Sequence, residues 1–312
     1  MARFLARRLL LAIPILLGVS IVVFITIKLI PGDPVSTLLG PNATPQARAD
    51  LTSRLGLDQP VPVQYFSWLK SVVQGDFGTS LTLQQPVGSL VSKAFLNTAL
   101  LAGTALVLAL IGGVILGTIV ALRPAGLLAK VVSASSVAAI SIPQYTVALL
   151  ALLFAVETGA LPTGGMHDTG MGGAGDLLEH LILPALAAAL TPMGIVARMY
   201  AVSLSDVLSQ EFIGSLRARG LTQTAVVRHA MHNAVPSLLT ITGLQVGYLL
   251  GGVLFVETIF SWPGLGLLVY QTISSRDMAV IQAGVLVSAV VLVLVNVLVD
   301  AIHGFIDPRV RA

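Results

Sequence analysis

Cysteine is absent from all 312 residues of the chain. Without a thiol, the chain has no disulfide, no thiolate-bound metal or iron–sulfur cluster, and no cysteine nucleophile. The absence also leaves the redox compartment undetermined, because cysteine usage is the compositional sign from which it is inferred.

Charged residues are scarce as well. They make up 10% of the chain, and 55% of the residues are hydrophobic, whereas a typical soluble domain has about 25% charged residues. Too few charges are available to cover a soluble core of this size, so lipid must solvate most of the surface. The net charge of +3 does not indicate nucleic acid binding, because the basic residues stand at the ends of apolar runs.

Several functional motifs are missing too. No G-x-x-x-x-G-K-[ST] phosphate-binding loop occurs, so ATP is not expected to bind this chain. The apolar runs carry no ionisable residue near their centres, which argues against proton or sodium coupling. His229 and His232 lie close together but have no third ligand nearby in sequence, so no metal site is predicted. All five histidines are expected in loops or at helix ends: His167, His180, His229, His232 and His303. No catalytic residue is predicted.

Long apolar runs dominate what is present. The first, 9–30, follows three arginines but is too long for a secretory signal, whose apolar core has about 7–15 residues. Further runs cover 98–122, 131–156, 182–202, 237–256 and 279–302. At about 20 residues per crossing, the sequence predicts an all-α integral membrane protein with six transmembrane helices.

The basic residues predict the orientation of these helices. With the N-terminus in the cytoplasm, eleven basic residues fall inside and six outside, as the positive-inside rule favours. The inside set is Arg3, Arg7, Arg8, Arg123, Lys130, Arg198, Arg217, Arg219, Arg228, Arg309 and Arg311. The outside set is Lys28, Arg48, Arg54, Lys70, Lys93 and Arg276. Both termini are then cytoplasmic.

The organisation along the chain suggests two parts. Residues 1–93 are predicted to form a transmembrane helix followed by a small helical cap outside the membrane, and residues 94–312 a five-helix core. In the cap, Thr44 can act as an N-cap before Pro45, with Gly56 just past the last turn at Leu55. A second cap helix is expected over 62–73 and carries Trp68.

The largest cytoplasmic loop, 203–236, has a pattern of its own. Apolar residues recur in it at helical spacing: Val207, Leu208, Phe212 and Leu216. Gly220 interrupts the pattern, and Thr222 can cap a second helix that reaches 229–233. The loop is therefore predicted to be a helix, a glycine turn and another helix, parallel to the membrane and suited to docking on a partner.

Small residues in the apolar runs allow two interpretations. Gly243, Gly247 and Gly251, like Gly113 and Gly117, recur every four residues. This spacing lets helices approach closely, either within the subunit or at a subunit interface.

Polar and turn-forming residues mark a candidate path. Gln245 and Tyr248 are expected to face the protein interior or a water-filled path. Pro143 permits a kink in the third crossing. The stretch 257–266 predicts a tight turn after the fifth crossing, in which Phe260 and Trp262 are either interface anchors or part of a gate. The candidate path or gate residues are Gln245, Tyr248, Glu257, Phe260 and Trp262.

An ordered set of motifs resembles one family over nearly the whole chain. The motifs are Pro31-Gly32-Asp33-Pro34, Leu55-Gly56-Leu57-Asp58-Gln59-Pro60, Gly75-Asp76-Phe77-Gly78-Thr79-Ser80, Arg217-Ala218-Arg219-Gly220-Leu221, Arg228-His229-Ala230, Asn233-Ala234, Glu257 to Gly266, Arg276-Asp277 and Asp307-Pro308-Arg309. Together they resemble the B-type permease subunit of bacterial dipeptide and oligopeptide ABC importers.

This resemblance implies a type I ABC importer permease (MetI-like) fold in the bacterial cytoplasmic membrane. The implied partners are a C-type permease subunit, two cytoplasmic ATPase chains that hold ATP and Mg²⁺, and an extracytoplasmic solute-binding protein; this chain itself needs no cofactor. The implied ATPase-coupling residues are Glu211, Phe212, Gly214, Leu216, Arg217, Ala218, Arg219, Gly220, His229 and Asn233. At the three positions of the family's E-A-A signature, this chain has Gly214, Ser215 and Leu216.

The expected function is ATP-driven import of small peptides. Glutathione, a nickel chelate or haem are alternative cargoes, since related systems carry them. Two rivals belong to other classes. An ATP-independent carrier or channel needs no docking loop, and a membrane-embedded enzyme is disfavoured because no nucleophile and base can be paired.

Overall fold

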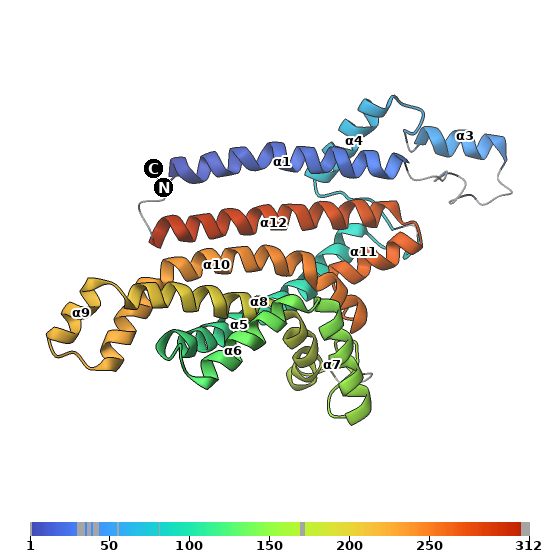
Figure 1. Cartoon of the computed structure of the whole chain (residues 1–312). Helices are drawn as coiled ribbons and strands as arrows, with labels where there is room; N and C mark the ends of the chain where they lie inside the picture. Colours follow the sequence, from blue (N-terminus) through green and yellow to red (C-terminus); the bar gives the residue numbers. More distant parts are fainter. Residues whose placement is uncertain are drawn as a thin grey trace. The chain divides into compact units, whose positions relative to one another are not determined.

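The computed structural model describes residues 2–29, 35, 39, 44–54, 56–80, 82–168 and 172–306. In this part of the chain the secondary structure is helical, and the only strand-like feature is an isolated bridge between Thr79 and Pro86. The named helices (Figure 1) are α1 (Ala2–Leu29), α3 (Pro45–Arg54), α4 (Val61–Val73), α5 (Val87–Leu122), α6 (Leu127–Ser141), α7 (Gln144–Thr158), α8 (Ala174–Leu208), α9 (Glu211–Ala218), α10 (Gln223–Ile259), α11 (Leu265–Ser274) and α12 (Met278–Ile306). The motif residues 31–34, 55 and 307–309 lie outside the described residues.

Within the described residues, five helices are long and apolar enough to cross a membrane, and a bent pair of helices makes a sixth span if it is counted as one. The five are found at Ala6–Thr26, Val87–Leu122, Ala174–Leu208, Gln223–Ile259 and Met278–Ile302. The pair is α6 and α7, at the predicted third crossing. The all-α membrane fold class expected from the apolar runs is therefore confirmed.

The third crossing is not the single helix predicted over 131–156. α6 and α7 are bent by 104° at the break between them. Pro143 has no N–H to continue the helix, and Ile142 before it takes an extended conformation with φ −82° and ψ 124°, as residues before proline do. The proline therefore breaks this segment and does more than kink it.

The long spans continue beyond the ends that the apolar runs suggested. α8 has 35 residues and α10 has 37, so they are about 52 and 55 Å long at 1.5 Å per residue. The hydrocarbon core of a bilayer is only about 30 Å thick. Each helix is therefore longer than the apolar layer is thick, and Arg198, whose apolar run was predicted to end at 202, lies well inside α8.

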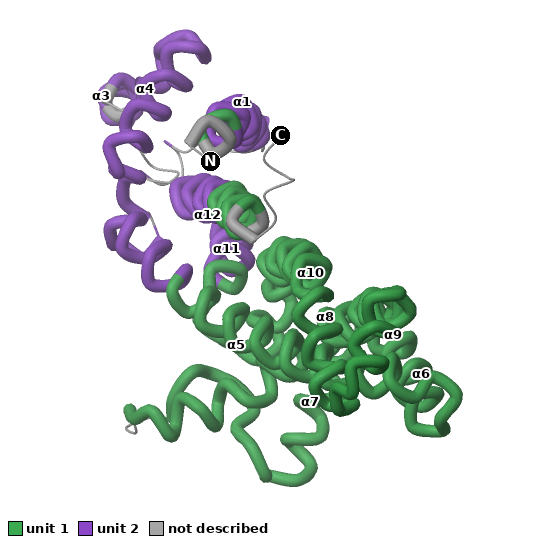
Figure 2. Tube along the Cα trace, turned by 90° about the vertical axis from the view of Figure 1, so that its left-hand side faces the viewer, with its two compact units in different colours: residues 1–7, 96–267, 292–312 green, residues 8–95, 268–291 purple. Residues whose placement is uncertain are grey.

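The chain divides into two compact units (Figure 2). The first comprises residues 1–7, 96–267 and 292–312, and the second residues 8–95 and 268–291. In the first unit α8 packs against α6, α7 and α10. Its most apolar 18-residue window is 72% buried, against 33% in α10 and 22% in α5. α8 is thus the central helix around which this unit is built.

Glycines make the close approach to α8 possible. A Cβ on Gly113 would collide with Val196, and one on Gly117 would collide with the backbone of Ala197. Of the two interpretations given above, the glycine pair of α5 therefore follows the first, close packing within the subunit. On α10, Gly243 lies against Val299 of α12, whereas Gly251 is exposed and has open space around it.

In the second unit, α4 packs against the end of α1 through aromatic rings. Phe24 lies 5.5 Å from Tyr65 and 5.7 Å from Trp68 between ring centroids. Ser20 shares a 2.8 Å hydrogen bond with the Tyr65 hydroxyl. The predicted helix carrying Trp68 is therefore confirmed, with bounds one residue longer at its start.

The helix predicted after Thr44 is also present, as α3. Thr44 Oγ1 accepts a hydrogen bond of 3.3 Å from the amide of Ala47, so it acts as the expected N-cap. Gly56 has a φ of +62°, a conformation that glycine adopts without strain. Of this prediction, only Leu55 lies outside the described residues.

Asp277 joins two distant segments of the second unit. It is the residue before α12, and its Oδ1 accepts a hydrogen bond of 3.4 Å from the amide of Val280. Its Oδ2 accepts from Ser80 Oγ at 2.6 Å and from Thr82 Oγ1 at 2.7 Å. Burial alone would raise the pKa of the Asp277 carboxyl, but these hydrogen bonds outweigh it and hold the pKa below its usual value.

Replacing Asp277 with asparagine is expected to lower stability by about 1–3 kcal/mol at neutral pH, because hydrogen bonds to an ionised group are lost. The lowered pKa means that this stabilisation is complete above the unfolded value of 3.8 and is lost as the pH falls through the folded value. The difference in thermal unfolding between Asp277→Asn and wild type should therefore shrink in acid. Asp58→Asn is the control, since Asp58 is exposed. A difference that persists unchanged in acid would contradict this role.

Candidate functional site

α9 is a short helix held between the ends of two long ones. α8 ends at Leu208, and the amide of Ser209 donates to the carbonyl oxygen of Ser205 at 3.1 Å. α9 begins at Glu211 with an acidic residue in its first turn and has Arg217 in its last, so both charges complement the helix dipole. Figure 1 shows α9 where α8 and α10 are joined.

The underside of α9 is apolar and buried. Ile213 is 1% exposed and lies in a cluster with Leu204 of α8 and Val226 of α10. Phe212 and Leu216 are partly buried against the same cluster. Because three side chains of one short helix are packed on two long helices, the orientation of α9 is coupled to both.

The opposite face of α9 and the turn after it are exposed. The exposed residues are Glu211, Gly214, Ser215, Arg217, Ala218, Arg219 and Gly220. The charged residues Glu211, Arg217 and Arg219 all belong to this exposed face and not to the buried cluster. This arrangement is typical of a helix that presents a polar surface to another protein.

Gly220 closes α9 by a turn that requires a left-handed residue. Its φ is +81°, and the amide of Leu221 donates to the carbonyl oxygen of Leu216 at 3.3 Å, as in a Schellman motif. The side chain of Thr222 then caps α10 by accepting from the amide of Ala225 at 3.4 Å. The predicted glycine turn and threonine cap are both present.

The second helix predicted in this loop is not a separate element. Residues 203–208 belong to α8, and residues 223–236 are the first part of α10, which continues through Pro236 into the fifth span. His229 and Asn233 therefore lie on a long helix, where both are exposed and Asn233 Nδ2 donates to the His229 carbonyl oxygen at 2.8 Å. A proline inside a helix does not end it when neighbouring helices support the backbone.

The stretch 257–266 is a hydrogen-bonded turn whose largest side chains are buried. The sequence predicted that Glu257 follows the fifth crossing. α10 extends to Ile259, so Glu257 instead lies in the last turn of that helix. Phe260 is 1% exposed and Trp262 0% exposed, and the indole Nε1 donates to the carbonyl oxygen of Asn97 at 3.0 Å. Two of the residues proposed as anchors or gate elements are thus enclosed by protein in this structure.

Glu257 connects three elements through its carboxylate. Oε1 accepts from the Thr98 hydroxyl at 2.6 Å, and Oε2 accepts from the amide of Leu267 at 3.1 Å. Thr98 Oγ1 in turn accepts from the amide of Leu265 at 2.8 Å. The carboxylate and the hydroxyl together cap the N-terminus of α11, where the helix dipole favours negative charge. Gly264 lies directly against this carboxylate and leaves no room for a Cβ.

The other two candidate path residues lie one turn apart on α10. Gln245 is 4% exposed, and its Oε1 has no hydrogen-bond partner among the described residues. Tyr248 is 41% exposed. Sequence reasoning missed Gln144, which is buried and donates to the Ala188 carbonyl oxygen at 3.3 Å; its position directly after Pro143 was the available signal. The role of Gln245 and Tyr248 in a path stays a prediction.

A different cluster was also missed at the start of α8. His180 was expected in a loop or at a helix end, but it lies within α8 and is 4% exposed. Among the described residues, Asp168, Asp176 and His180 form the one group of three ligand-type side chains whose atoms all lie within 4.8 Å of one another. The i, i+4 spacing of Asp176 and His180 was a signal for it, but Asp168 comes from the preceding loop.

Two family models cover most of the chain. Residues 113–312 match the binding-protein-dependent transport system inner membrane component. Residues 1–102 match the N-terminal part of this membrane component. The chain belongs to this family. In this binding-protein-dependent transport component, α9 lies within the larger matched region, 113–312.

Relatives of this transport component align over its full length. The dipeptide transport system permease protein DppB of Alkalihalophilus pseudofirmus is 40% identical, and the alignment covers 100% of both chains. The glutathione transport system permease protein GsiC of Salmonella choleraesuis is 37% identical over 100% of this chain and 99% of its own. The resemblance to dipeptide permeases stated from the motifs is therefore confirmed.

A solved structure shares the fold. A chain of the inward-facing methionine ABC transporter MetNI matches with a TM-score of 0.56 and 21% identity, over 70% of this chain and 96% of that chain. The match confirms the predicted MetI-like permease fold for this inner-membrane component.

Proposed function

We propose that this chain is one of two different permease subunits of an ATP-driven importer and that α9 receives the movement of an ATPase partner. ATP and Mg²⁺ bind to two ATPase chains in the cytoplasm. A solute-binding protein delivers the cargo from the other side of the membrane. Alternating access follows when the ATPases move α9 and thereby shift the balance between inward-open and outward-open states.

One observation supports this function more than any other: one face of α9 is packed on α8 and α10, and its opposite face is exposed. Its buried Ile213 ties it to α8 and α10, and its outer face exposes Glu211, Arg217 and Arg219. α8 and α10 are both longer than the bilayer is thick. A push on α9 is therefore transmitted to the two long helices and not absorbed by a loose loop. The exposed His229 and Asn233 extend the proposed docking surface along α10.

Small peptides are the proposed cargo. The relative with 40% identity is named for dipeptide transport, and the relative with 37% identity is named for glutathione, which is itself a tripeptide. Peptide-sized, zwitterionic cargo is the chemistry that both names share. Neither of these two names refers to a nickel chelate or haem.

The proposed orientation places α9 and both termini in the cytoplasm. Because the natural chain has no cysteine, single cysteines can be introduced without removing others. We expect a membrane-impermeant maleimide added to intact cells to label Gln74→Cys and Gln271→Cys but not Ser215→Cys, three positions that are exposed. Labelling of Ser215→Cys only after the cells are opened completes the prediction, whereas labelling in intact cells would reverse the topology.

The subunit composition is tested by tagging the full chain, extracting it in mild detergent and identifying the co-purifying chains by mass spectrometry. The proposal expects a second six-helix permease and ATPase chains, with ATPase activity in the preparation. A carrier or channel of another class would be isolated without either. Loss of ATPase co-purification in the double variant Arg217→Glu, Arg219→Glu would assign the contact to α9, with Lys130→Glu on the exposed side of α6 as the control.

A further inference from the structure

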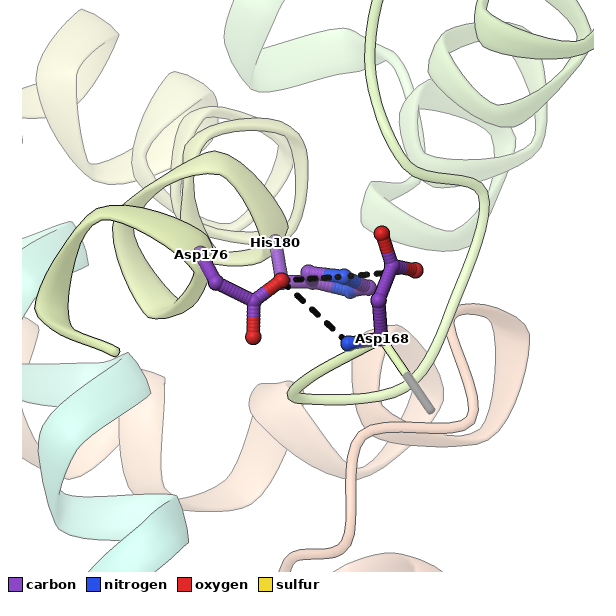
Figure 3. Close-up of side chains that lie close together, drawn as sticks. All are labelled: Asp168, Asp176 and His180. Carbon is purple, nitrogen blue, oxygen red and sulfur yellow. Dashed lines mark hydrogen bonds and ion pairs between the residues drawn. The ribbon is translucent and has the colours of Figure 1, made fainter. Parts of the chain in front are cut away.

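The cluster at the start of α8 has the geometry of a cation site. His180 Nε2 lies 3.4 Å from Asp168 Oδ1 and 3.4 Å from Asp176 Oδ1. Figure 3 shows the imidazole of His180 between the carboxyl groups of Asp176 and Asp168. Ligand atoms about 2.1 Å from a tetrahedral zinc ion lie about 3.4 Å from one another. The two separations therefore match those of ligands that share one tetrahedral ion.

His180 supplies the second, independent observation. Its side chain is 3% exposed, and Nε2 is buried without a hydrogen-bond partner in the described part of the chain. Its other ring nitrogen, Nδ1, lies 3.1 Å from the Gly164 carbonyl oxygen. A carbonyl accepts only, so Nδ1 carries the proton there. In the neutral ring, the lone pair of Nε2 then faces two carboxylates and no donor.

The surroundings of the cluster hold it in place. The amide of Gly165, next to the carbonyl that orients His180, donates to the Phe260 carbonyl oxygen at 2.8 Å. Asp176 is oriented by His167, whose Nδ1 lies 2.9 Å from Oδ2, and by the Asp168 amide at 3.2 Å from Oδ1. Metal-binding histidines and carboxylates are oriented by outer partners of these two kinds.

We propose that Asp168, Asp176 and His180 bind a divalent transition-metal ion of the Zn²⁺ type. One imidazole and two carboxylates suit such an ion, with solvent as the fourth ligand at the exposed Asp168 side. Ca²⁺ and Mg²⁺ prefer oxygen ligands only and a larger number of them, so the site discriminates against both. The site joins the α7 to α8 loop to α8 and lies next to the turn that follows α10.

The test is a titration of the full-length chain purified in detergent and stripped with a chelator. We expect one equivalent of Zn²⁺ to bind saturably, Co²⁺ to bind with the strong visible absorption of four-coordination, and Mg²⁺ not to compete. Asp168→Asn and His180→Gln should each weaken binding at least about tenfold. Asp206→Asn is the matched control, because Asp206 is an exposed carboxylate elsewhere on α8.

The outcomes separate the alternatives. Asp168 is 70% exposed, so its asparagine variant should fold even if His180→Gln does not. Binding that is absent in wild type, or unchanged in Asp168→Asn, overturns the proposal and leaves the three side chains as a cluster without a bound ion. His229→Gln is tested as well. If binding is lost only in this variant, the ion belongs to the exposed pair His229 and His232 on α10, and the proposal is overturned. None of these results depends on transport activity.

Discussion

Replacement of Gly220 by valine is expected to reduce ATP-dependent peptide uptake at least about tenfold while the chain still inserts into the membrane. Gly220 has a φ of +81°. This conformation costs a residue with a Cβ about 1–2 kcal/mol, and β-branched residues such as valine are the least able to adopt it. A Cβ there meets no atom within 4 Å, so the effect acts on the backbone turn alone. Relief of the strain displaces α9 relative to α10, and the proposed coupling fails.

Two variants control for this prediction. Gly220→Asn should retain most of the uptake, because asparagine tolerates the left-handed conformation. Gly103→Ala should retain all of it, since Gly103 is a helical, exposed glycine of α5 with open space around it. Uptake is measured with a labelled dipeptide in cells that express equal amounts of each variant in the membrane. Normal uptake by the valine variant would remove α9 and its turn from the mechanism.

Replacement of Glu257 by alanine is expected to lower the free energy of unfolding by about 3–5 kcal/mol, because two buried donors lose their acceptor at about 1–3 kcal/mol each and a buried side chain is removed. Glu257 is 0% exposed. The Thr98 hydroxyl and the amide of Leu267 lose their acceptor, and the cavity beside Gly264 adds to the loss. α11 also loses its N-terminal cap.

The measurement is the thermal unfolding of the purified chain in detergent, together with the yield of folded protein. Glu157→Ala is the matched control, because Glu157 is an exposed glutamate near the end of α7, and it should change stability by less than about 0.5 kcal/mol. Thr98→Val should destabilise less than Glu257→Ala, since it removes one bridge of the network. Equal stability of Glu257→Ala and Glu157→Ala would show that the network does not hold the turn.

Features encoded within a few residues could be predicted from the sequence. The cap at Thr44 and the turn at Gly220 depend on local backbone geometry, and both are present. The spans follow from apolar runs that only lipid can solvate. The break at Pro143 was visible as a proline, but its angle depends on how α6 and α7 pack against α8, and no local pattern contains that information.

Features that join distant residues could not be predicted in the same way. Thr98 and Glu257 are 159 positions apart, so the capping role of this glutamate was invisible and the turn was interpreted as a possible gate. The start of α8 was hidden because 172–175 is rich in glycine and the apolar run begins later. His180 was consequently placed outside the helix, and its cluster with Asp168 and Asp176 was missed.

The central claim is that α9 couples this permease to ATP hydrolysis on other chains. The most direct measurement reconstitutes the co-purified assembly and, separately, this chain alone into liposomes, and follows entry of a labelled dipeptide with and without ATP. We expect ATP-dependent accumulation by the assembly only, and its loss in the assembly that carries Gly220→Val. Entry through the isolated chain without ATP would contradict coupling through α9 and make the protein a carrier or channel.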